Sequence, residues 1–216
     1  MDADLVHRLV LQGLRWIHLL FGVVWLGHLY FFNFVQVHYE KALAPELKKA
    51  VVPQVRGRAL WWFRWGAMLT LLSGLCYLIY EQLIGGNRRF QGWFETSADR
   101  WITFGMTLGA VMWFNVWFVI WPRQQVILAS ISGQREKPAD FDALVAVAGR
   151  FSKINAYLSL PMLFGMGARS HFAMKTALGD LIMMAVVLAV GVGVAVHLVL
   201  HIGPKVGREF LPEPPK

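Results

Sequence analysis

The sequence is poor in cysteine and in charge. Its 216 residues include one cysteine, Cys76, and only 16% are Asp, Glu, Lys or Arg, whereas soluble domains carry about 25% charged residues. A single cysteine allows no intramolecular disulfide, and the missing CxxCH motif excludes covalently attached c-type haem. No polar segment exceeds about 30 residues, which is too short for an independent soluble core. We therefore expect one domain over residues 1–216.

Two other kinds of signal are missing. The N-terminus, MDADLVHR, is acidic first and leads directly into an apolar stretch, without the basic n-region and cleavage site of a signal peptide. The net charge is +8, but the basic residues flank apolar stretches instead of forming a stripe, so we expect no nucleic-acid partner. No Ser-His-Asp set, phosphate-binding glycine loop or paired-carboxylate site is found in the sequence.

Apolar residues, in contrast, are abundant: 56% of the chain is hydrophobic, with 10 Trp and 15 Phe. About 20 apolar residues in a helix cross the roughly 30 Å hydrocarbon core of a bilayer. The pattern predicts an all-α integral membrane protein, a bundle of about five transmembrane helices. The expected spans are about 11–36, 60–80, 101–121, 151–172 and 180–203.

The segments between the spans carry further expectations. Pro53 is predicted to end a short surface helix, because proline disrupts a helix interior. The third span is predicted to close at Trp121-Pro122, and the amphipathic segment 123–149 to lie on the membrane surface. Pro161 predicts a kink in the fourth span, and Asn155 in the same span is expected to bond across helices.

The distribution of Lys and Arg predicts the orientation. The 37–58 loop, the 123–153 segment and the C-terminal tail together hold thirteen, against seven in the segments on the other side. The positive-inside rule then places the N-terminus outside and the C-terminus in the cytoplasm. We expect a multi-pass protein of the bacterial inner (cytoplasmic) membrane, with the lipid bilayer as its first partner.

Histidines occur inside three of these spans. His18 and His28 lie in the first, His171 at the end of the fourth, and His197 and His201 in the fifth. Ionisable residues inside a span usually face a packed interior, a cavity or a cofactor. We expect His18 with His171, and His28 with His197 or His201, to form axial pairs for the iron of one or two b-type haems.

Other residues support or compete with this interpretation. Arg64 is a candidate partner for the haem propionates, because a guanidinium suits bidentate contact with carboxylates, although it could also snorkel to the interface. The histidines could instead serve as interhelical hydrogen-bonding groups. A non-haem metal at His197 and His201 has no third ligand nearby in the sequence.

Four stretches carry a resemblance to a known family: RWIHLLFGVVWLG (15–27), WWFRWGAMLTLLSG (61–74), NVWFVIWPRQQ (115–125) and GRFSKINAYLSLPMLFGMGARSHF (149–172). In these the chain resembles the membrane domain of the bacterial urate oxidase (urate hydroxylase) family, whose members carry a C-terminal cytochrome c domain. We expect no such domain in this chain, because its sequence contains no CxxCH motif. The first helix is also weakly similar to copper-resistance-type proteins and to haem-dependent protoporphyrinogen oxidases.

The resemblance supports some of the candidate site residues as positions that match the family pattern, and it does not support the others. The supported positions are His18, Arg64, Trp65, Asn155, Pro161 and His171. The resemblance does not supply His28, His197 or His201.

Together these observations predict a membrane-embedded b-type haem subunit that passes electrons between quinone or quinol and a partner redox protein. Its partners would be other membrane or cytochrome subunits, and its role that of an oxidoreductase component. Two alternatives remain open. One is a structural or assembly subunit without a cofactor, and the other is a urate oxidase-like membrane enzyme, which rests on the resemblance alone.

Overall fold

The computed structural model describes residues 2–83, 93–172 and 174–207, and within these ranges every regular element is helical. Three of the elements are π-helical segments, labelled η. In chain order the elements are α1 (Ala3–Tyr30), η1 (Phe31–Gln36), α2 (Val37–Ala42), α3 (Pro45–Leu83), α4 (Ser97–Phe114), η2 (Asn115–Ile120), α5 (Trp121–Ile131), α6 (Phe141–His171), α7 (Ala177–His197) and η3 (Leu198–Ile202).

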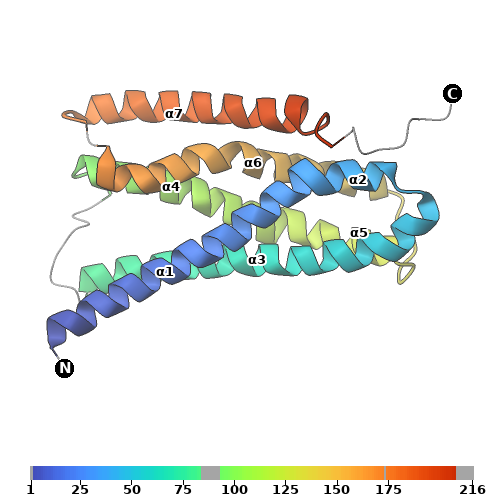
Figure 1. Ribbon diagram of the computed structural model, residues 1–216, viewed down its shortest axis with the longest axis horizontal. Coiled ribbons are helices and arrows are strands. Elements are labelled where there is room, and N and C mark those ends of the chain that lie inside the picture. The colour runs from blue at the N-terminus through green and yellow to red at the C-terminus, as the bar shows by residue number, and fades with distance from the viewer. Residues whose placement is uncertain (1, 84–92, 173, 208–216) are drawn as a thin grey trace.

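The elements join into long rods that run side by side (Figure 1). Four of these rods are long and apolar enough to cross a membrane: Ala3–Ala42, Pro45–Leu83, Ser97–Ile131 and Ala177–Ile202. Between the last two in the chain comes α6, with 31 residues, or about 46 Å at 1.5 Å per residue. It covers the span predicted at 151–172 up to His171 but is not one of the four rods. The predicted all-α membrane bundle is confirmed.

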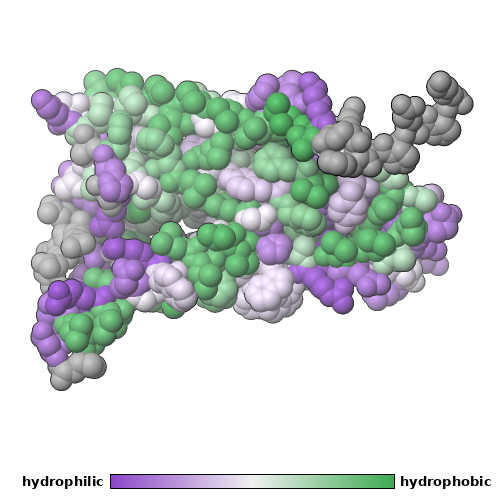
Figure 2. All heavy atoms as spheres, viewed as in Figure 1, coloured by the Kyte–Doolittle hydropathy of each residue, from purple (hydrophilic) through white to green (hydrophobic). Residues whose placement is uncertain are grey.

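The ends of the bundle differ from its middle. Figure 2 shows apolar side chains over much of the visible face and hydrophilic ones gathered towards the two ends. The α2–α3 and α5–α6 connections and the end of η3 lie at one end, away from the N-terminus (Figure 1). These segments belong to the side predicted to be cytoplasmic. The orientation itself stays a prediction.

The structure corrects two predicted helix ends. Pro53 lies inside α3 instead of ending a helix; its neighbour Val52 is only 2% exposed, so packing holds this segment in the helix despite the missing N–H. The third rod continues past Trp121 to Ile131, because Pro122 falls in the first turn of α5, where a missing N–H costs little. Ile127, predicted on the membrane surface, is 1% exposed.

Glycines bring α4, α6 and α7 close together. A Cβ at Gly105 of α4 would lie 2.9 Å from the Met166 backbone of α6, and a Cβ at Gly191 of α7 would lie 2.8 Å from the Pro161 ring. The prolyl ring in α6 is therefore covered by a glycine of the next rod. The main core lies beside this contact, where α1, α3, η2 and α6 meet around Leu29 and Phe63.

Candidate functional site

His18, near the middle of α1, and His28, in its last turn, both point towards α3. The Nδ1 atom of His18 lies 2.8 Å from the Thr70 carbonyl oxygen, and its ring packs so closely on Gly74 that a Cβ there would lie 3.0 Å from Nδ1. The Nδ1 atom of His28 lies 2.7 Å from the Val24 carbonyl oxygen. Because a carbonyl only accepts, Nδ1 is the donor in both rings, and Nε2 carries the free lone pair.

The other predicted ligands lie on different surfaces. His171 is the last residue of α6 and is exposed. His197 and His201 are exposed on the last rod, with their rings stacked at 5.2 Å and 16°. Among the described side chains, no hydrogen bond or ring contact joins His18 to His171, or His28 to either histidine of the stack. Only His197 and His201, of the five, are brought together.

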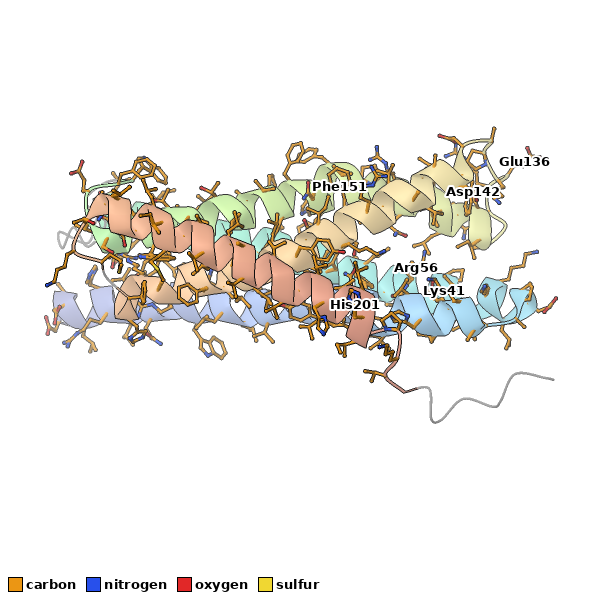
Figure 3. The ribbon with its side chains drawn as sticks, turned by 90° about the horizontal axis from the view of Figure 1, so that it is seen from above. Lys41, Arg56, Glu136, Asp142, Phe151 and His201 are labelled. Atoms are coloured by element: carbon orange, nitrogen blue, oxygen red, sulfur yellow. The ribbon has the colours of Figure 1, made fainter. Side chains whose placement is uncertain are left out.

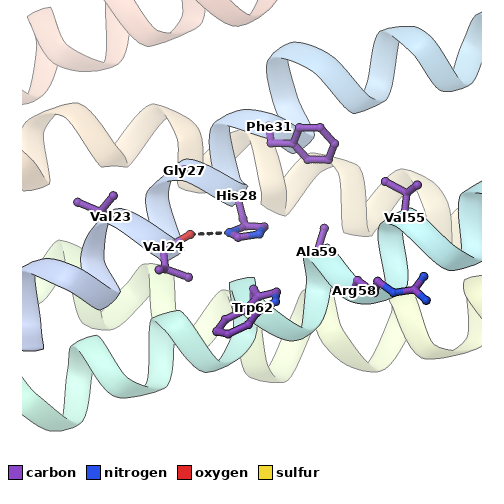
Figure 4. Close-up of a pocket in the computed structure, with 9 residues that line it drawn as sticks. All are labelled: Val23, Val24, Gly27, His28, Phe31, Val55, Arg58, Ala59 and Trp62. Carbon is purple, nitrogen blue, oxygen red and sulfur yellow. Dashed lines mark hydrogen bonds between the residues drawn. The ribbon is translucent and has the colours of Figure 1, made fainter.

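His28 lies in an open groove of 480 Å³ between α1 and α3 (Figure 4). The lining residues recur at helical spacing, so each helix contributes one face to the groove. They are Val23, Val24, Gly27, His28, Phe31, Val55, Arg58, Ala59 and Trp62.

The donor set of this groove fits a haem with one axial ligand from this chain. A metal-bound histidine ordinarily donates its other ring N–H to a carbonyl or carboxylate, as His28 does to Val24. Gly27 and Ala59 contribute little side-chain volume, which leaves room for a flat macrocycle. Arg58 brings a guanidinium suited to carboxylate groups, and His28 is the one imidazole among the lining residues.

Sequence reasoning singled out His28 but missed Arg58, Ala59 and Trp62. Arg58 falls in the 37–58 loop, whose Lys and Arg residues predict the orientation, and Trp62 falls in the 61–74 stretch that carries the family resemblance. The available signal was their register: 55, 58, 59 and 62 share one face of a helix. What the sequence did not show is that this face lies opposite Gly27 and His28.

Arg64 lies away from the groove, in a cluster of tryptophans. It lies two positions after Trp62, which places the two side chains about 200° apart around α3. Its guanidinium carbon lies 3.8 Å from the ring centroid of Trp121 and 5.4 Å from that of Trp117. Such contacts stabilise a cation by about 0.5–2 kcal/mol. The predicted propionate contact for Arg64 stays a prediction.

A buried polar network crosses the middle of the bundle. Asn115 donates to Asn155 Oδ1 at 2.8 Å, and Asn155, fully buried, donates to the Met112 carbonyl at 2.9 Å. The cross-helix bond predicted for Asn155 is confirmed. One turn further along the same face of α6, the Ser159 hydroxyl bonds to the Tyr30 hydroxyl at 2.9 Å. In the described ranges, no group of three or more His, Cys, Asp or Glu residues could hold a metal ion.

The fold and its grooves define a multi-pass helical membrane protein. The family model described as Urate oxidase N-terminal matches residues 87–210, more than half of the chain, and the chain belongs to that family. The matched range includes His171, His197 and His201, whereas His18, His28 and Arg64 precede it. No curated protein and no solved structure matches the chain.

Proposed function

We propose that the chain is a membrane-embedded redox subunit that binds b-type haem in the groove between α1 and α3 and passes electrons between quinol and a partner redox protein. The observation that carries the proposal is the state of His28. Its Nδ1 atom is bonded to Val24, and the ring stands in an otherwise apolar groove beside Arg58. Haem bound there would supply one-electron redox chemistry.

Each side chain of the groove has a distinct task in this proposal. His28 offers Nε2 to the iron, and the Val24 carbonyl holds the ring in the ligating tautomer. Arg58 pairs with a propionate. Trp62 and Phe31 flank the site and keep water from it. Because the groove is open and provides one imidazole, a second axial ligand would come from another chain, in keeping with the predicted membrane or cytochrome partners.

An absorbance spectrum of the purified protein tests the proposal. The wild-type chain, isolated from haem-replete membranes, should show a Soret band and a reducible α-band, and His28→Ala should lose them. His201→Ala, which removes an exposed histidine outside the groove, is the matched control and should keep them. Loss in the control with retention in His28→Ala would overturn the assignment. A wild-type protein without a chromophore would favour the structural or assembly subunit.

The family match favours a second candidate, a membrane enzyme that oxidises urate. The two candidates differ in the electron donor, which is quinol in the first and urate in the second. Incubation of the purified chain with urate and an electron acceptor, followed by urate absorbance, separates the two candidates. Under the electron-carrier proposal, quinol reduces the chromophore and urate is not consumed. Urate turnover by the chain alone would favour the enzyme.

A further inference from the structure

A second cavity, of 680 Å³, lies at the end of the bundle that carries the α2–α3 and α5–α6 connections. All three π-helical segments contribute to its wall, through Asn33 of η1, Ile120 of η2 and Val199 of η3. π-helical turns inside α-helices often occur at functional sites. The groove of His28 shares none of these residues, so the cavity is a separate site.

The wall of this cavity is basic. Among the described residues that line it, Lys41, Lys48, Arg56 and Lys153 are cationic, and Glu40 is the single carboxylate. Glu40 is already paired with Arg56. No ion pair joins the three lysines to a carboxylate within the described part of the chain. Figure 3 shows Lys41 and Arg56 on the adjacent α2 and α3. The wall therefore favours an anion.

Two amide oxygens in the wall call for a hydrogen-bond donor. Gln36 is 4% exposed and donates from Nε2 to Glu40 Oε1 at 2.6 Å. This bond fixes the amide, because the flipped arrangement would set its oxygen against the carboxylate. The Oε1 atom of Gln36 is buried and has no hydrogen-bond partner, and the same holds for Oε1 of Gln124. A buried acceptor is costly when left unpaired, so a ligand that donates O–H groups would satisfy both.

The cavity also changes from basic to apolar along α3. Lys48, Val52, Arg56, Leu60 and Phe63 all line it and recur every three or four residues on one helix face. The stripe begins with a lysine near the start of α3 and ends at Phe63, which is 1% exposed. A ligand that fills the cavity would therefore be charged at one end and apolar at the other.

From these features we infer that the cavity binds the phosphoglycerol headgroup of an anionic lipid. The phosphate lies against the lysines, the glycerol hydroxyls donate to Gln36 and Gln124, and an acyl chain follows the apolar part of the α3 stripe. Basic pockets between transmembrane helices are known binding sites for anionic headgroups. The inference does not depend on haem in the other groove.

Native mass spectrometry of the full chain, with added phosphatidylglycerol as the probe, tests this inference. The double variant Lys41→Gln/Lys153→Gln should bind the lipid about thirtyfold more weakly, since each basic residue contributes to headgroup attraction. Both lysines are exposed, so the fold should be retained. The control Lys49→Gln/Arg150→Gln removes the same charge from exposed positions outside the cavity and should bind as the wild type does. Equal weakening in both double variants would overturn the inference.

Three further probes identify the source and the headgroup. Phosphatidic acid has the phosphate but no headgroup glycerol, so it should bind more weakly than phosphatidylglycerol. Gln124→Leu should reduce that difference, because Gln36 is then the one amide left to accept from the glycerol. Glycerol phosphate, which has no acyl chains, should bind much more weakly than the lipid. Equal binding of glycerol phosphate would identify a free phosphate ester as the ligand and overturn the lipid assignment. Displacement of phosphatidylglycerol by a quinol would overturn it as well.

Discussion

Asp180 at the start of α7 accepts a hydrogen bond from Nε of Arg100 in α4 at 2.8 Å and forms an ion pair with Nη2 of the same guanidinium at 2.7 Å. Trp101 Nε1 donates to the same carboxylate at 2.9 Å, and Asp180 is fully buried. The pair therefore attaches the last rod to the bundle at the end opposite the cavity. Removing one partner leaves the other charge buried and uncompensated.

The first prediction concerns this attachment. Asp180→Ala should lower the free energy of unfolding by about 3–5 kcal/mol, the range for breaking a buried ion pair. Thermal unfolding in detergent measures the effect. Asp142→Ala is the control, because its ion pair with Lys137 spans 3.6 Å and is largely exposed, and it should change stability little. Equal losses in the two variants would contradict the role given to Asp180.

The second prediction fills the groove of His28 without touching the imidazole. Gly27→Leu should reduce haem content sharply, because its side chain would occupy the space beside the ring. A Cβ at Gly27 meets nothing within 4 Å, so the backbone should accept the change. Haem per protein, measured by the pyridine haemochrome assay, gives the result. Gly13→Leu on the same helix, where a Cβ also meets nothing, should keep its haem; wild-type haem in both variants would place the cofactor elsewhere.

The third prediction concerns the network at Asn155. Asn155→Ala leaves the Asn115 amide and the Met112 carbonyl without their partner and should destabilise the protein by about 1–3 kcal/mol for each group left unpaired. The double variant Asn115→Ala/Asn155→Ala removes both amides and should cost less than the sum of the two single alanine changes. A double-mutant cycle on unfolding midpoints measures the coupling. Strict additivity would show that the two amides do not interact.

The fourth prediction tests the contact of α6 with α7. Gly191→Val should push the rods apart, since even a Cβ there would lie 2.8 Å from the Pro161 ring. A loss of about 1–3 kcal/mol is the usual cost of overpacking. Gly193→Val, two residues along and without a neighbour within 4 Å, is the matched control and should leave the unfolding midpoint unchanged. Similar midpoints for the two variants would mean that α7 is not held by this contact.

The membrane class and the approximate helix positions could be predicted from sequence, because long apolar runs report directly on the bilayer. The helix ends could not. Pro53 normally disrupts a helix interior, but here the packing of Val52, which no local pattern encodes, keeps it inside α3. Residues 123–131 look amphipathic because α5 has one buried face, around Ile127, within a rod that continues from the span.

The candidate site shows the same limit. An ionisable residue within an apolar run is unusual, so His28 could be singled out from the sequence alone. Its partners Arg58 and Trp62 have ordinary alternative explanations at a membrane interface. Their grouping depends on how α1 is set against α3, which is decided by packing along both helices. For the same reason, the pairing of histidines between distant spans could not be derived from their depth in the membrane.

The three π-helical segments change the direction in which the side chains beyond them face. A π turn takes in about one residue more than an α turn, so the helix beyond it is rotated by about 100° from where an uninterrupted wheel would place it. Without the extra residue in η1, Glu40 and Lys41 would face another direction while Trp25 and Leu29 kept their places in the core. The basic side chains at the ends of the rods can therefore face one direction while the apolar side chains in the middle face another.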